Sequence, residues 1–312
     1  MSTETGIEWT DATWNPVRGC SKVSEGCRHC YAMSVAARFS GPGQPYEGLA
    51  TRSPARWTGK VAFVETHLAD PFRWKRPRLV FVNSMSDLFH EDIPDAWIDR
   101  VFGVMAAAGN HTFQVLTKRP ERMRDYVRGL AHNYDRLEAG ARSAFRTLRF
   151  QGIPLVPWPI PNVWLGTSVE DQAAANARIG ALIATPAAVR FLSCEPLLGP
   201  LSFRWAAWAP LNGQRVNREH LDGLRGHVQW VIAGGENGPK ARPCDLNWLR
   251  AIRDQCDAAG VPFFLKQLGG WPNKRGHLDA VLDGQRWTQM PARVPPAGRG
   301  PTTERERNDE RE

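Results

Sequence analysis

The stretch Arg78-Leu-Val-Phe-Val-Asn-Ser-Met-Ser-Asp87 is the part of the sequence that indicates a fold most directly. It begins as a short, continuously apolar run, which is typical of a strand buried on both faces. It then changes abruptly to polar side chains. This pattern favours a parallel sheet covered by helices, in which polar groups gather at the carboxyl ends of the strands.

Similar segments recur along the chain and alternate with helical patterns. The other segments with strand character are residues 7–14, 60–65, 112–117, 163–167, 189–193, 228–233 and 261–266. The clearest helical patterns between them cover residues 31–39, 94–108, 121–130, 171–184 and 246–259. About eight such units predict an α/β fold with a single (β/α) TIM-like barrel, closed or partly open. An open doubly wound sheet is the alternative, but no Gly-x-Gly-x-x-Gly motif follows the first strand.

We expect one domain over residues 1–293 and a disordered tail over 294–312, where Pro, Gly and mixed charges replace the apolar pattern. The hydrophobic fraction of 42% suits a globular protein with a sizeable core. No run of eighteen apolar residues and no signal-peptide pattern is present, so we expect a cytoplasmic protein with reduced thiols and no membrane partner.

Three of the six cysteines lie within eleven positions, directly after the first strand segment. Cys20, Cys27 and Cys30 form a C-x6-C-x2-C motif. Three thiols cannot pair off among themselves, but they can hold three corners of a metal site and leave the fourth open for chemistry. Both zinc and an iron–sulfur cluster fit this donor set. A zinc site completed by another ligand, with Cys194 or His29 as candidates, and plain buried thiols are the alternatives.

Polar side chains follow nearly every strand segment. They are Asn83, Ser84 and Asp87, then Lys118 and Arg119, Ser168, Glu195, the run Gly234-Gly235-Glu236, and Lys266. Because the carboxyl ends of parallel strands meet at one end of a barrel, we expect these groups to surround one cavity. Their mixed charges suit a zwitterionic or phosphate-bearing ligand. The two glycines would let a ligand approach the backbone, and Glu236 could accept hydrogen bonds from an amino group.

The net charge of +8 and the thirteen tryptophans together suit a nucleic-acid surface, since cations neutralise phosphates and aromatic rings stack on bases. DNA or RNA is therefore a candidate partner. The alternative is that most of the tryptophans pack in the core.

Five stretches of the sequence closely resemble the phage-type three-cysteine-motif protein family, whose function is largely unassigned. They are residues 7–20, 81–90 (Phe-Val-Asn-Ser-Met-Ser-Asp-Leu-Phe-His), 116–120, 234–239 (Gly-Gly-Glu-Asn-Gly-Pro) and 261–267. They occur in order over most of the chain, and the family is treated as related to the radical SAM enzymes.

The resemblance implies a barrel in which Cys20, Cys27 and Cys30 hold a [4Fe–4S] cluster. It also implies that the unligated iron binds S-adenosylmethionine, with Ser168, Glu195, Gly234, Gly235 and Glu236 around this cofactor. Asn83, Ser84, Asp87, Lys118, Arg119 and Lys266 would then contact substrate or anionic groups. An electron donor, unknown from the sequence, would start the radical chemistry. Two alternatives remain open: a nucleic-acid-binding protein with a structural or redox-sensing cluster, and a zinc-containing barrel.

Overall fold

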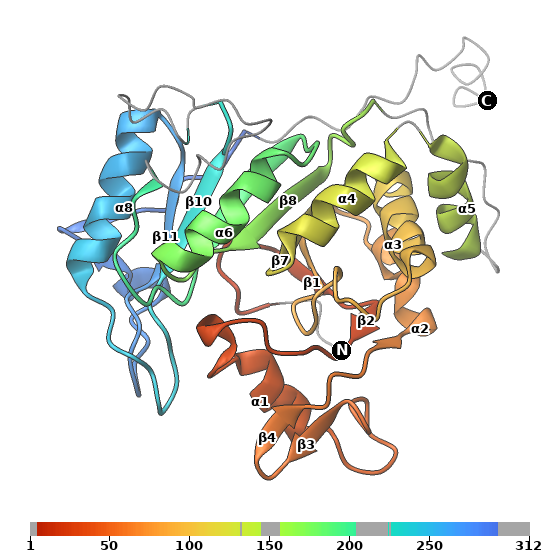
Figure 1. The fold of residues 1–312 in the computed structure, drawn as a ribbon, viewed down its shortest axis with the longest axis horizontal. Helices are drawn as coiled ribbons and strands as arrows, with labels where there is room; N and C mark the ends of the chain where they lie inside the picture. Colours follow the sequence, from red (N-terminus) through yellow and green to blue (C-terminus); the bar gives the residue numbers. More distant parts are fainter. Residues whose placement is uncertain (1–4, 132, 145–156, 204–223, 225, 293–312) are drawn as a thin grey trace, which may run out of the picture.

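A seven-stranded, entirely parallel sheet is the centre of the computed structural model, which describes residues 5–131, 133–144, 157–203, 224 and 226–292 (Figure 1). Its strands, in spatial order, are β1 (Ala12–Trp14), β6 (Leu79–Val82), β7 (Thr112–Thr117), β8 (Val163–Ser168), β9 (Val189–Cys194), β10 (Trp230–Gly234) and β11 (Phe263–Gln267). The spatial order equals the chain order. The sheet therefore curves in one direction as a half-barrel.

The sheet is not closed into a barrel within the part of the chain that the structure describes. β1 and β11 are its two edges and do not pair with each other. The free edge of β11 is covered by an antiparallel segment instead, in which Leu265 N donates to Trp287 O at 2.8 Å and Gln289 N donates to Phe263 O at 3.1 Å. The α/β fold predicted from the sequence is confirmed, and of the two barrel forms expected only the open one fits these edges.

The prediction that residues 60–65 form a strand of this sheet is wrong. Only β5 (Ala62–Phe63) forms there, and it pairs antiparallel with β2 (Val17–Arg18) in a separate two-stranded ribbon. Two further ribbons are made of β3 (Ala50–Arg52) with β4 (Ala55–Trp57), and of β12 (Val281–Leu282) with β13 (Gln285–Arg286). The sheet thus has one strand fewer than an eight-stranded barrel.

Helices cover the convex face of the sheet. They are α3 (Asp95–Ala107), α4 (Pro120–Leu130), α6 (Gln172–Ile183) and α8 (Leu246–Ala259) (Figure 1). α4 packs on α6, and α5 (Tyr134–Ala144) packs on α3. The short α2 (Glu65–Leu68) precedes β6. Single-residue signals set several ends: Pro120 begins α4, Asp171 accepts a hydrogen bond from Ala174 N at the start of α6, and left-handed Gly260 ends α8.

The concave face carries a second, aromatic core. Alternate residues of the strands place Phe81, Trp164, Phe191, Trp230 and Phe264 on this face, where Trp9 joins them. The intervening strand residues, among them Val80, Val115 and Val231, belong to the core under the helices. Most of these aromatic residues lie toward the amino ends of the strands, so the concave face is filled there and becomes polar toward the carboxyl ends. The packing alternative for these tryptophans is confirmed.

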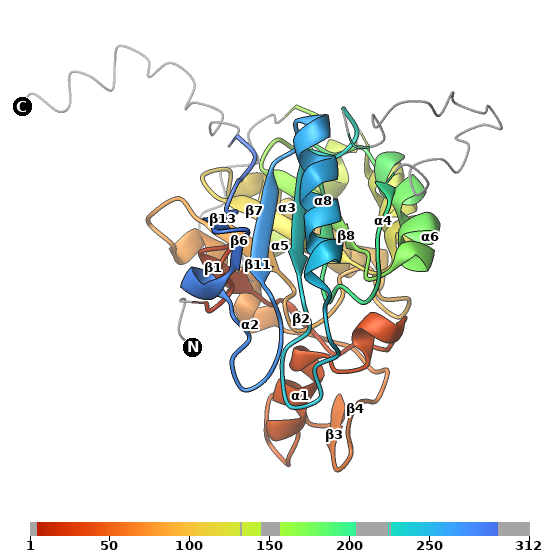
Figure 2. The same cartoon turned by 90° about the vertical axis from the view of Figure 1, so that its left-hand side faces the viewer.

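A projecting arm and two loops extend from the carboxyl end of the sheet. The arm consists of α1 (Tyr31–Arg38) and the β3–β4 ribbon, which pack on each other. In Figures 1 and 2 it projects from the same end as the loops after β10 and β11. Tyr31 Oη donates to Ser84 O at 2.7 Å, which fastens α1 to the end of β6.

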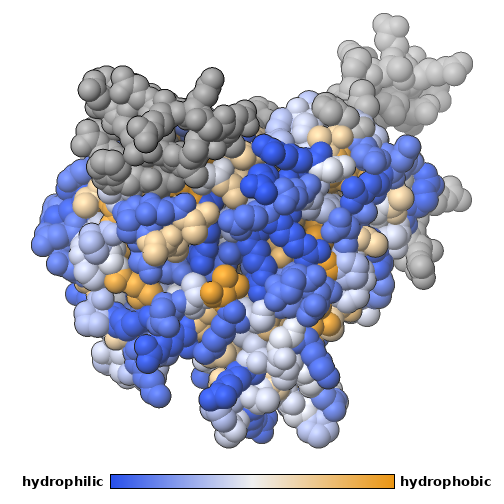
Figure 3. Space-filling view, viewed as in Figure 1, coloured by the Kyte–Doolittle hydropathy of each residue, from blue (hydrophilic) through white to orange (hydrophobic). Residues whose placement is uncertain are grey.

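The face of the molecule shown in Figure 3 is hydrophilic over most of its area, and its hydrophobic patches are small. No helix in the described part of the chain has both the length and the apolar composition needed to cross a membrane. The predicted tail at 294–312 lies outside the described residues.

Candidate metal and ligand site

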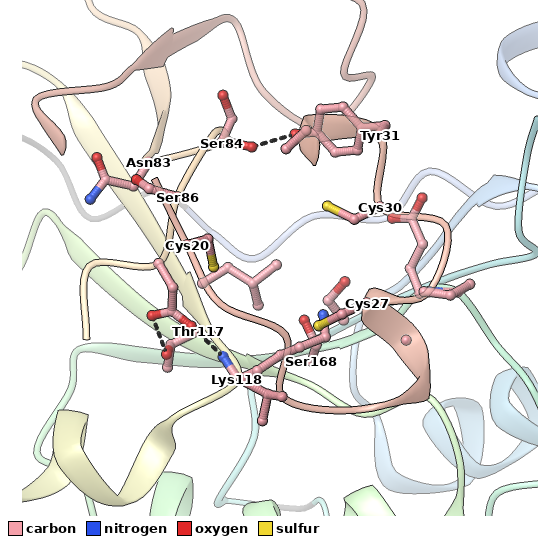
Figure 4. Close-up of a pocket in the computed structure, with 18 of the residues that line it drawn as sticks. Cys20, Cys27, Cys30, Tyr31, Asn83, Ser84, Ser86, Thr117, Lys118 and Ser168 are labelled. Carbon is pink, nitrogen blue, oxygen red and sulfur yellow. Dashed lines mark hydrogen bonds between the residues drawn. The ribbon is translucent and has the colours of Figure 1, made fainter. Parts of the chain in front are cut away.

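A cavity of about 210 Å³ opens at the carboxyl end of the sheet, beneath the loop that contains Cys20, Cys27 and Cys30. All three cysteines line it (Figure 4). A single water needs roughly 10–15 Å³ of such space, so the cavity has room for far more than one ion. Thirteen of the fourteen site residues expected from the sequence line it, the exception being Gly234.

The three thiols lie close enough to influence one another. Burial raises the pKa of Cys20 to about 12, and the neighbouring Asp87, Cys30 and Cys27 add to this increase. Burial also raises the pKa of Cys30, while the charge of Lys118 partly opposes the effect. Without a bound metal, Cys20 and Cys30 are therefore protonated at neutral pH, and metal binding would release their protons.

Several polar groups of the cavity have no hydrogen-bond partner among the described residues. The Lys118 ammonium and the hydroxyls of Ser168 and Ser193 form no hydrogen bond there. Ser168 and Ser193 are direct neighbours in the β8–β9 register. The amide nitrogen of Asn83 is buried and also unpaired. A cation and hydroxyls left free in a cavity are available to a ligand.

Other charged groups of the cavity are already paired. Asp87 accepts hydrogen bonds from Thr117 Oγ1 at 2.7 Å and from Arg119 Nη1 at 3.1 Å. Lys266 Nζ lies 2.5 Å from Glu195 Oε1, whereas Glu195 Oε2 has no partner in the described part of the chain. Glu195 is thus the lining carboxylate with a free oxygen.

Glu236 belongs to an ion-pair network that holds the cysteine loop. Its carboxylate accepts three hydrogen bonds from Arg242, at 2.6–2.9 Å, and one from His29 Nδ1 at 3.0 Å. Arg242 Nη2 also donates to Glu25 O at 3.0 Å. Arg242, which sequence reasoning missed, therefore occupies the Glu236 carboxylate that was expected to bind a ligand amino group.

The hydrogen bonds to Glu236 have a consequence for stability at low pH. Although burial alone would raise it, the bonds from Arg242 and His29 lower the pKa of Glu236 from 4.5 to about 2. The carboxylate therefore stabilises the fold above pH 4.5, and this contribution disappears as the pH falls toward 2. We expect a loss on the order of 2 kcal/mol, allowing for solvent screening at Arg242.

This prediction is tested by urea unfolding of the metal-free protein at pH 5 and pH 3. Glu236→Gln is expected to be less stable than the wild type at pH 5, with the difference shrinking at pH 3. Glu138→Gln, which alters an exposed carboxylate on α5, should follow the wild type. A pH dependence that is the same in Glu236→Gln and the wild type would contradict the assignment.

Two glycines let the site close tightly. A Cβ atom on Gly26, in the cysteine loop, would lie 2.9 Å from the carboxyl carbon of Glu170. A Cβ atom on Gly235 would lie 2.4 Å from the carbonyl oxygen of Leu268. Both glycines thus serve contacts within the protein. Gly235 also lines the cavity, so the expectation that it lets a ligand approach the backbone stays a prediction.

One cysteine singled out in the sequence lies elsewhere. Cys194 is fully buried in the helix-covered core near Cys256, so it does not line the cavity. His29 lines the cavity with the three cysteines.

These features define a class of protein: an α/β half-barrel with a cysteine-lined cavity at the carboxyl ends of its parallel strands. The chain belongs to DUF5131, a family of proteins of unknown function, whose family model matches residues 4–291. No curated protein and no solved structure matches the sequence.

Proposed function

We propose that the protein is an iron–sulfur enzyme of the radical SAM type, in which Cys20, Cys27 and Cys30 hold a [4Fe–4S] cluster. The observation that carries this proposal is the arrangement of three thiols around a cavity much larger than a single ion. Three thiolates leave one iron open, and the cavity provides space for a small ligand beside it. A bound cluster would supply the electron for reductive cleavage of S-adenosylmethionine.

The residues of the cavity fit both groups. A [4Fe–4S] cluster with three thiolates carries net negative charge in its oxidised form, and Lys118 is an unpaired cation beside Cys30. For the cosubstrate, the free oxygen of Glu195 suits the amino group, in place of the Glu236 expected from the sequence. The hydroxyls of Ser168 and Ser193 can donate to a carboxylate. Trp9 and Phe81, which also line the cavity, provide an apolar wall.

Metal analysis of protein purified without oxygen tests the proposal. We expect iron and acid-labile sulfide in a ratio near one, with little zinc, and formation of 5′-deoxyadenosine after addition of S-adenosylmethionine and a strong reductant. Iron and sulfide without cleavage under any reductant would remove the radical step and favour a structural or redox-sensing cluster. Zinc alone would exclude both.

A second candidate, a zinc site, is favoured by His29. Its Nδ1 donates to the Glu236 carboxylate, which leaves Nε2 as the free ring nitrogen. Histidines that bind metals commonly have this carboxylate partner. Cys20, Cys27, Cys30 and His29 would together form a Cys₃His donor set. The two candidates differ in their dependence on His29, since His29→Ala should release zinc but leave a cluster held by the three cysteines.

A further inference from the structure

The positive charge of the chain is concentrated around the mouth of the cavity. Three segments surround it, residues 20–60, 237–243 and 268–278, and we call them together the rim. The first and second contribute lining residues. The third is joined to the second by a parallel β-bridge between Asn237 and Gly270. Figures 1 and 2 show these segments at one end of the molecule.

The rim contains ten Lys and Arg but only two Asp and Glu, Glu25 and Glu47. The whole chain has 40 basic and 32 acidic residues, so the rest of it holds thirty of each and is formally neutral. The rim thus accounts for the entire net charge of +8. Five of its cations are exposed and have no hydrogen-bond or ion-pair partner in the described part of the chain: Lys22, Arg38, Arg56, Lys60 and Lys240.

The large apolar side chains that the structure exposes are gathered in the same place. Six are exposed among the described residues, and five of them belong to the rim: Val23, Tyr31, Phe39, Trp271 and Leu278. Trp271 is 63% exposed, on the loop after β11. An indole left this exposed gives up the stabilisation that burial of an aromatic ring normally provides to a protein.

We infer that the rim binds single-stranded nucleic acid. Free cations neutralise phosphates, and exposed aromatic rings stack on unpaired bases, so the combination is complementary to a strand whose bases are accessible. A flexible strand also fits a concave mouth, because one nucleotide can turn toward the cavity while its neighbours remain on the rim. The inference names a substrate class for the proposed enzyme, but binding at the rim does not require a cluster.

Fluorescence anisotropy of the full-length protein with labelled 20-nucleotide single strands of DNA and RNA tests this inference. We expect binding that weakens as salt is raised. The triple variant Arg38→Ala/Arg56→Ala/Lys240→Ala should reduce the slope of log K against log salt by about 2, from roughly 0.7 per cation removed. Lys75→Ala/Arg76→Ala/Arg286→Ala removes the same charge from exposed positions outside the rim and should leave the slope unchanged.

Trp271 provides an independent readout. Trp271→Ala is expected to weaken binding about tenfold without altering the salt slope, and Trp271→Phe should restore most of the affinity. The inference is overturned if the control triple variant weakens binding as much as the rim variant. It is likewise overturned if single strands fail to bind at low salt, or if the protein prefers vesicles of anionic lipid or duplex DNA. Because iron content is measured separately, loss of strand binding and loss of the cluster are distinguishable.

Discussion

Cys30→Ala is expected to lose nearly all bound iron and the broad visible absorption of the cluster, whereas Cys244→Ala keeps both at the wild-type level. Cys30 lines the cavity with Cys20 and Cys27. In the proposed cluster, each of these three thiols would supply one of three protein ligands. Removing one leaves two thiolates, too few to retain a cluster with an open iron. Cys20→Ala and Cys27→Ala should have the same effect.

Cys244 is a matched control because it is a partly buried thiol close to the site but outside the lining. Far-ultraviolet circular dichroism should show that all four variants fold, since none of the four thiols belongs to the main core clusters as a fully buried residue. Retention of iron in any of the three loop variants would show that its thiol is not a ligand. Loss of iron from Cys244→Ala would show that the assignment of ligands is incomplete.

The strands of the half-barrel could be predicted because each is a local pattern. Residues 112–117 match β7 at both ends, and residues 189–193 differ from β9 by one residue. Their apolar character and the polar residues after them follow directly from burial on both faces and exposure at the carboxyl end. The same logic brought the cysteine loop and the polar strand ends to one cavity.

The edges of the sheet could not be predicted, because strand propensity does not specify a partner. Residues 60–65 have strand character, yet Ala62 and Phe63 pair with the chain segment beside the cysteine loop. The segment around Trp287 and Gln289 has no strong strand pattern, yet it covers the free edge of β11. Closure is decided by these long-range pairings, and each depends on the whole fold.

Ion pairs between segments that are distant in the chain could not be predicted from the sequence either. Arg242 follows Glu236 by six residues in an irregular loop, so no helix or strand spacing connects them. Its contact with Glu25 joins residues 217 positions apart. As a consequence, both carboxylate oxygens of Glu236 accept hydrogen bonds within the protein. Glu195 Oε2 is the carboxylate oxygen of the cavity that accepts none from the described residues.

Arg178→Ala is expected to destabilise the protein by about 3–5 kcal/mol, because it would leave the carboxylate of Glu170 buried without its ion-pair partner. Glu170 is fully buried, and Arg178 Nη1 donates to Glu170 Oε2 and to Ser168 O, each at 2.9 Å. Although burial opposes it, the charge of Arg178 keeps the pKa of Glu170 below its ordinary value. Urea unfolding at pH 7 measures the loss.

Arg124→Ala removes an exposed guanidinium that lies 2.8 Å from Asp125, and it should cost less than about 1 kcal/mol. If Arg178→Ala costs as little, the buried pair does not stabilise the fold. The double variant Glu170→Leu/Arg178→Leu removes both charges and should recover much of the lost stability, since no unpaired charge remains.

The double variant also separates stability from the role of the carboxylate at the site. Gly26 packs directly on the Glu170 carboxyl group, so this carboxylate contacts and supports the cysteine loop. We therefore expect the double variant to regain stability but to bind less iron than the wild type, because Cys27 is adjacent to Gly26. Full iron content in the double variant would mean that Glu170 stabilises the half-barrel without positioning the loop.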